Sequence, residues 1–219
     1  MFDRADYSLS DFMLFSARVY FRMFELHNAA LWPLHILAFI FGAFLIAAAI
    51  KPTRLRIRSA YALLALAWLF IAWSFFLERY ASINWAAVYV APVFMLQAAL
   101  LVYMAVRPEA PECAPLRNIR HGLATSTLVF SIIGYPLVAP VLGRSWNAAE
   151  VFAIAPDPTA IATLAILVIG RGMVTMLAAV IPLLWLIVTT LTLHTLGSPE
   201  FVLAPIAVLL CGVAVIARN

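Results

Sequence analysis

The chain has 219 residues, of which 66% are hydrophobic and only 11% are charged. A soluble domain cannot bury so much apolar surface, so the composition predicts a polytopic membrane protein. The net charge of +4 comes from basic residues spread over short loops. That distribution excludes the basic patch of a nucleic-acid-binding protein. The first apolar stretch follows neither a basic n-region nor a small-residue cleavage site, so we expect no removable signal peptide.

Residues 10–26 are predicted to form an amphipathic helix that lies in the membrane interface. Asp11, Arg18, Arg22 and Glu25 follow one another at offsets of seven, four and three, which places them on one helical face. An almost uninterrupted apolar stretch begins at Ala29. We therefore divide the chain into an interfacial entry segment, residues 1–28, and a single transmembrane domain, residues 29–219.

Seven apolar stretches are predicted to cross the bilayer, which makes the fold all-α integral membrane. The fifth stretch is short, because Gly170-Arg171-Gly172 divides the apolar run over residues 159–193. One long helix there would bury Arg171 in hydrocarbon, so we expect a tight turn. The predicted spans are residues 29–50, 59–77, 84–106, 122–142, 157–170, 173–194 and 201–217.

The charges of the loops predict the orientation of the spans. Nine of the 14 Lys and Arg residues fall on one side of this topology. The side of a membrane protein that is rich in Lys and Arg faces the cytoplasm. We therefore expect the N-terminus outside and the C-terminus in the cytoplasm.

Polar residues gather at the predicted outer ends of the spans and form an outward-facing candidate ligand site. Offsets of four and seven place Asn28, Trp32 and His35 on one face of the first span. The competing interpretation is that such groups cap helices and anchor spans at the interface. Asp157, for example, follows Pro156 at a predicted helix start, where the helix dipole stabilises a negative charge, so capping is the simpler interpretation. The functional alternative is that Asp157 accepts a proton or a cation. The full candidate set is Asn28, Trp32, His35, Asn84, Asp157, Thr159 and His194.

The histidines are weak candidates for a metal or haem site. Imidazole suits zinc, copper or iron, but His27, His35 and His194 lack i, i+4 spacing and no cysteine or methionine cluster accompanies them. We therefore predict no cofactor. The sequence also offers no nucleophile–base pair, phosphate-binding loop or paired carboxylates, so we predict that the protein is not an enzyme. Gln97, near the middle of the third span, is expected to bond a neighbouring helix.

Five short motifs resemble those of a family of bacterial inner-membrane proteins that is classed only as a domain of unknown function. Three positions depart from its pattern: Phe75-Phe76 replaces Tyr-His, Arg144 replaces the His of a Gly-His pair, and Asp157 replaces the Cys of Pro-Cys-Pro-Thr. The resemblance implies a multi-pass protein of the bacterial inner membrane and brings no known activity. The motifs are His27-Asn28-Ala-Ala-Leu-Trp32-Pro33, Ile83-Asn84-Trp85-Ala86-Ala87, Tyr135-Pro136 with Gly143, Pro156-Asp157-Pro158-Thr159 and Ile181-Pro182-Leu-Leu-Trp185.

These observations favour an accessory or structural subunit of a larger inner-membrane complex, respiratory, photosynthetic or otherwise energy-transducing. The absence of a catalytic set, the short loops and the aromatic-rich spans motivate this prediction. Its partners would be the lipid bilayer and other integral membrane subunits. The first alternative is a small transporter or ligand-binding membrane protein with an outward-facing site, and the second is a haem- or metal-binding membrane protein.

Overall fold

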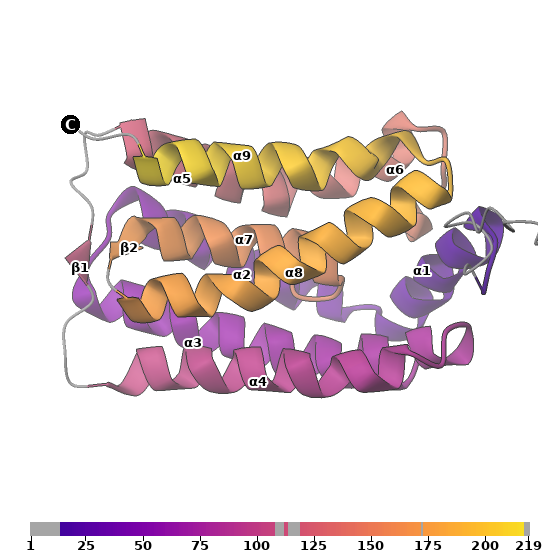
Figure 1. Ribbon diagram of the computed structural model, residues 1–219, viewed down its shortest axis with the longest axis horizontal. Helices are drawn as coiled ribbons and strands as arrows, with labels where there is room; N and C mark the ends of the chain where they lie inside the picture. Colours follow the sequence, from indigo (N-terminus) through magenta and orange to yellow (C-terminus); the bar gives the residue numbers. More distant parts are fainter. Residues whose placement is uncertain (1–13, 108–111, 114–118, 172, 217–219) are drawn as a thin grey trace, which may run out of the picture.

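The computed structural model describes residues 14–107, 112–113, 119–171 and 173–216. Long helices run side by side along the long axis of the molecule (Figure 1). At one end, β1 (Glu112–Cys113) pairs antiparallel with β2 (Gly170–Arg171). The remaining elements are α1 (Ala17–Leu31), α2 (Leu34–Ile50), α3 (Arg54–Ile71), η2 (Ala72–Leu77), η3 (Tyr80–Ser82), α4 (Ala87–Val106), α5 (Ile119–Val129), η4 (Phe130–Gly134), η5 (Tyr135–Leu137), α6 (Val138–Val141), η6 (Trp146–Ala148), α7 (Pro156–Ile169), α8 (Met173–Thr195), η7 (Pro199–Val202) and α9 (Leu203–Ile216).

Helix α1 lies at the end of the bundle opposite β1 and β2 (Figure 1). Ser16 caps it, because the Ser16 hydroxyl oxygen accepts a hydrogen bond from the backbone N–H of Val19 at 3.4 Å. The chain turns at Pro33, which lacks a backbone N–H, and α1 and α2 meet at an angle of 94°. The predicted amphipathic helix is therefore present from Ala17, whereas Asp11 lies outside the described residues.

The boundary between this helix and the first span differs from the prediction. We expected the span to begin at Ala29, but α1 continues to Leu31 and α2 begins at Leu34. Asn28 thus belongs to α1 and His35 to α2, so Asn28, Trp32 and His35 do not share the face of one helix. The apolar run masks this break, which is caused by Pro33.

Among the described residues, five helices are long and apolar enough to cross a membrane, and the α1–α2 pair would make a sixth if it is one bent span. The prediction of a helical protein with several apolar helices of membrane-spanning length is therefore confirmed. The seventh span, the orientation and the division at residue 28 stay predictions. The five helices are Arg54–Ser82, Ala87–Val106, Ile119–Val141, Met173–Thr195 and Pro199–Ile216.

Helix α7 occupies the centre of the bundle. It has only 14 residues, all of them buried, and α2, α3, α5, α8 and α9 contact it. A helix that is apolar on every side belongs in an interior, and small residues such as Ala160, Ala162 and Ala165 let its neighbours approach closely. Trp68 of α3 fixes it further by donating its indole N–H to the Thr163 hydroxyl oxygen at 2.8 Å.

Polar side chains also join the outer helices. The Gln97 side chain in α4 donates an N–H to the carbonyl oxygen of Ala178 in α8 at 3.0 Å. The predicted bond from Gln97 to a neighbouring helix is confirmed. In an apolar bundle such a bond fixes the register of two helices, because sliding would leave the amide buried without a partner.

Candidate functional site

Asp157 is the most completely hydrogen-bonded side chain at the start of α7. It is fully buried and accepts bonds from the Trp185 indole N–H at 2.7 Å, the Thr189 hydroxyl at 2.7 Å and the Tyr135 hydroxyl at 3.2 Å. Trp185 and Thr189 are four residues apart and so lie on one face of α8. We expected a capping residue, but the three bonds of Asp157 join α7 to α8 and to η5 instead.

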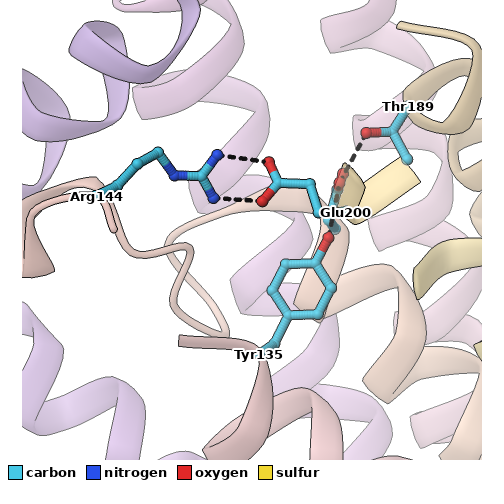
Figure 2. A network of polar contacts seen from close by, with 5 residues as sticks. Tyr135, Arg144, Thr189 and Glu200 are labelled. Carbon is cyan, nitrogen blue, oxygen red and sulfur yellow. Dashed lines mark hydrogen bonds and ion pairs between the residues drawn. The ribbon is translucent and has the colours of Figure 1, made fainter. Parts of the chain in front are cut away.

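An ion pair between Arg144 and Glu200 lies near the Asp157 carboxylate (Figure 2). Figure 2 shows the guanidinium of Arg144 facing the carboxylate of Glu200 in a two-bond fork, near Tyr135 and Thr189. One of the two bonds joins Nη1 of Arg144 to Oε1 of Glu200 at 3.1 Å. Because Arg144 follows α6 and Glu200 belongs to η7, the pair ties two segments that are far apart in the sequence. Forked Arg–carboxylate pairs fix geometry as well as charge.

Glu150, in the loop before α7, is the least satisfied acid of the region. It is buried, and its Oε2 atom has no hydrogen-bond partner among the described residues. Burial, together with the negative charges of Asp157 and Glu200, holds the pKa of the Glu150 carboxyl well above its usual range, against the opposing effect of Arg144. Glu150 is therefore expected to keep its proton where an exposed glutamate would lose it.

Helix α1 covers the loop that leads into α7. The Asn28 side chain donates N–H bonds to the carbonyl oxygens of Asn147 at 2.7 Å and Ala149 at 2.8 Å. Nε2 of His27 lies 3.4 Å from the carbonyl oxygen of Ile154. The loop is entirely buried from residue 148 to residue 155, so these contacts satisfy backbone groups that water cannot reach.

Thr159 secures the same loop from the side of α7. Its hydroxyl accepts a bond from the backbone N–H of Ala153 at 2.8 Å and donates one to the carbonyl oxygen of Ala155 at 2.8 Å. Ala153 has a φ of 65°, in the left-handed region that residues with a side chain seldom adopt. Thr159 thus supports a strained turn, which explains why a threonine occupies this buried position.

His35 and Trp32 complete the corner between α1 and α2. Nε2 of His35 lies 3.1 Å from Oδ1 of Asn28, and the rings of Trp32 and His35 are 6.0 Å apart between centroids. Asn28 therefore bonds α2 on one side and the loop on the other. The structure brings these three predicted residues together, although across a break and not along one helix.

Asn84 and His194 have local partners of their own. Oδ1 of Asn84 accepts a bond from the backbone N–H of Ala86 at 3.0 Å, at the start of α4. The ring of His194 packs edge-on against Phe201 at 5.1 Å. The seven predicted residues thus belong to four settings: the α1–α2 corner with its loop, the start of α7, the start of α4 and the end of α8.

The three weak metal candidates likewise have different surroundings. His27 faces a backbone carbonyl, His35 faces Asn28, and His194 faces an aromatic ring. Among the described residues, no three His, Cys, Asp or Glu side chains are grouped closely enough to hold a metal ion. The expectation that the protein carries no cofactor stays a prediction.

Comparison with known proteins identifies the family. The model of a family of unknown function, DUF6064, matches residues 17–219. The chain belongs to the DUF6064 family. No curated protein and no solved structure matches it. The resemblance to an uncharacterised family is confirmed to this extent, and membership of DUF6064 brings no activity with it.

In this member of DUF6064, several residues of the buried polar cluster escaped the sequence prediction. A partial signal was present: Trp185 and Thr189 are polar groups spaced four apart within an apolar helix, a pattern that indicates a shared buried partner. For Glu150 and Glu200, which lie in loops between predicted spans, the sequence carries no such signal. The residues of the cluster that lie outside the predicted candidate set are Tyr135, Arg144, Glu150, Trp185, Thr189 and Glu200.

A mostly apolar groove lies between α8 and α9, two helices that also contact each other, and at one end it is bordered by α7 and by Arg120 of α5. It contains one cavity of about 530 Å³ and a second of about 380 Å³, and both are lined by Leu183 and Val208. The first cavity extends towards Gly212 of α9. A Cβ atom added at Gly212 would meet no atom of the described neighbouring helices within 4 Å. The groove therefore leaves part of the α9 backbone accessible from outside.

Proposed function

We propose that this protein is a non-enzymatic integral membrane protein and works as an accessory subunit of a larger inner-membrane complex. One observation carries the proposal: most of the buried polar side chains around Asp157 are occupied with one another and with the backbone, Glu150 being an exception. Asp157 has three donors, Asn28 bonds two carbonyl oxygens, and Arg144 is paired with Glu200. Such bonds hold a scaffold together and leave few groups for chemistry on a substrate.

The groove between α8 and α9 is the surface that we assign to the partner. Only 28% of the α9 span is buried within the protein, against 61% of the span that starts at Arg54. Without a hydrophobic driving force between helices in lipid, association depends on close packing, which an accessible glycine backbone permits. We therefore propose that an apolar transmembrane helix of the partner subunit packs along this groove.

The test is a pull-down of the full chain from native membranes in a mild detergent, with mass spectrometry of the co-purifying proteins. The proposal predicts a stoichiometric membrane partner that survives a salt wash. Recovery of the 24.1 kDa protein alone would contradict it. An absorption spectrum and metal analysis of the same eluate test the haem or metal alternative, which requires a chromophore or a stoichiometric metal.

A small transporter is the second candidate, and Glu150 is the observation that favours it. A buried carboxyl with an unpaired oxygen, near two other acids, is a group that can take up and release a proton. Proteoliposomes loaded with a pH-sensitive dye test this candidate. It predicts proton flux under an imposed pH gradient that is lost in Glu150→Gln, whereas the subunit proposal predicts no flux in either protein.

A further inference from the structure

A cavity of about 290 Å³ lies between α1 and the segment that follows α6. It shares no lining residue with the α8–α9 groove and is built differently, because several charged side chains line it. Three arginines and one glutamate contribute to its wall, together with a phenyl ring, a hydroxyl and a methyl group. The lining residues are Arg18, Phe21, Arg22, Glu25, Arg144, Ser145 and Ala148.

The charges of this cavity do not cancel. Arg22 is paired with Glu25 across one helical turn, and Arg144 is paired with Glu200. Arg18 is exposed and has no hydrogen bond or ion pair with any described residue. Counting the described residues alone, Arg18 therefore leaves the lining of the cavity with an excess positive charge.

Arg144 is the lining residue of the cavity that the structure holds most firmly. The Nε–H of Arg144 is buried and lacks a hydrogen-bond partner in the described part of the chain. The guanidinium of Arg144 lies 3.8 Å from the centroid of the Phe21 ring, a cation–π contact that restrains its position. A ligand in the cavity would therefore meet a positive charge that is held in a fixed position, since the Arg144 side chain is 20% exposed, and would not meet the buried Nε–H itself.

We propose that this cavity binds a phosphate group. Arginine is the side chain that suits phosphate best, because its planar donors match two oxygens at once. The α1 helix is amphipathic and joins the first span at 94°, so its polar face lies where phospholipid head groups would be found. The phosphate can thus come from a lipid head group or from a free phosphate ion. This inference does not rest on the accessory-subunit proposal, which concerns α8 and α9.

The presence of Glu25 beside the arginines allows a stringent test, because the proposal predicts opposite effects on phosphate binding for substitutions at Arg18 and at Glu25. Arg18→Gln removes the unpaired positive charge and is expected to weaken phosphate binding about tenfold, the effect of one lost charge-assisted hydrogen bond. Glu25→Gln removes the negative charge and releases Arg22, so it is expected to tighten binding severalfold. Arg56→Gln is the matched control, because Arg56 is an exposed arginine outside this cavity that bonds the Lys51 carbonyl oxygen.

The experiment titrates the purified full chain, in a neutral detergent, with dihexanoyl phosphatidylglycerol and separately with inorganic phosphate, and follows binding by microscale thermophoresis. Binding of both ligands supports the proposal and assigns the source as free phosphate. Binding of the lipid alone also supports it and assigns the source as a lipid head group. In either case Arg18→Gln must weaken the binding and Glu25→Gln must strengthen it. Failure of both ligands to bind, or equal affinities in the two variants, overturns the proposal.

Discussion

Trp185 donates its indole N–H to the carboxylate of Asp157 over 2.7 Å, and this bond joins the middle of α8 to the first turn of α7. Trp185 also packs edge-on against Phe76 at 5.1 Å and Phe94 at 5.4 Å. One residue thus connects the polar centre of the bundle to its aromatic core. The carboxylate is consequently a fixed part of the fold, and disturbing it is expected to loosen several helices together.

The first prediction concerns the removal of this carboxylate. Asp157→Ala leaves three buried donors without an acceptor, each costing about 1–3 kcal/mol, so the free energy of unfolding should fall by about 3 kcal/mol or more. Asp157→Asn should cost only about 1 kcal/mol, because the hydroxyls of Thr189 and Tyr135 can rotate to accept from the new amide. Denaturant titration in mixed micelles, followed by circular dichroism, measures both.

Glu78→Ala is the control for this comparison. Glu78 is an exposed acid that accepts a bond from the Trp73 indole at 2.7 Å, and a surface change of this kind should stay within about 0.5 kcal/mol of the parent protein. If Asp157→Ala lowers the free energy of unfolding no more than Glu78→Ala does, the structural role assigned to Asp157 is wrong.

The second prediction concerns the attachment of α1. Asn28→Asp exchanges an N–H donor for a carboxylate oxygen that faces the carbonyl oxygens of Asn147 and Ala149. Repulsion between these oxygens should release α1, so that backbone amides in α1 and in residues 148–155 exchange faster with deuterated water. Asn147→Asp is the matched control, because only the backbone of Asn147 takes part in the contact. Equal exchange in the two variants would count against the role assigned to Asn28.

The third prediction concerns Arg144 and Glu200. Replacing either partner by glutamine leaves a largely buried charge uncompensated and should cost about 3 kcal/mol of stability. The double variant should cost clearly less than the sum of the two single variants, because it removes both charges. A double-mutant cycle measured by chemical unfolding gives the coupling energy directly. If the stability losses of the two single variants simply add in the double variant, the interaction between Arg144 and Glu200 contributes nothing to stability.

The fourth prediction is a pH dependence that arises from Glu150. Because burial raises the pKa of its carboxyl, the folded protein keeps this proton to a higher pH than the unfolded chain does. Stability should therefore fall as the pH rises from the ordinary glutamate pKa, about 4.3, towards the raised value. Glu150→Gln should flatten this part of the profile and raise the melting temperature at pH 7. Parallel melting profiles from pH 4.5 to pH 8 for the two proteins would refute the assignment.

Much of the secondary structure could be predicted from the lengths of the apolar stretches and the residues that interrupt them. The predicted fifth span, residues 157–170, corresponds closely to α7 at Pro156–Ile169. Its position in the centre could not be predicted, because an apolar stretch has the same composition whether lipid or other helices surround it. The break at Pro33 was hidden for a related reason: the residues on both sides of it are apolar.

The polar cluster was only partly predictable. The importance of Asp157, Asn28 and His35 followed from their positions near the ends of apolar stretches. Their partners, including Tyr135 and Trp185 for Asp157, depend on which helices are neighbours, and no local pattern in one sequence gives that information. Glu200 is far from Arg144 in the chain, so their pairing emerges only in the folded bundle (Figure 2).

The most direct test of the account is a pull-down that compares a groove-filling variant with a matched one. Gly212→Leu places a bulky side chain in the α8–α9 groove, whereas Gly122→Leu adds the same side chain to α5 at a position equally free of neighbouring atoms. Both variants should fold. We expect the membrane partner to co-purify with the parent protein and with Gly122→Leu but not with Gly212→Leu. Equal recovery of the partner with both variants, or no partner with the parent protein, would contradict this expectation.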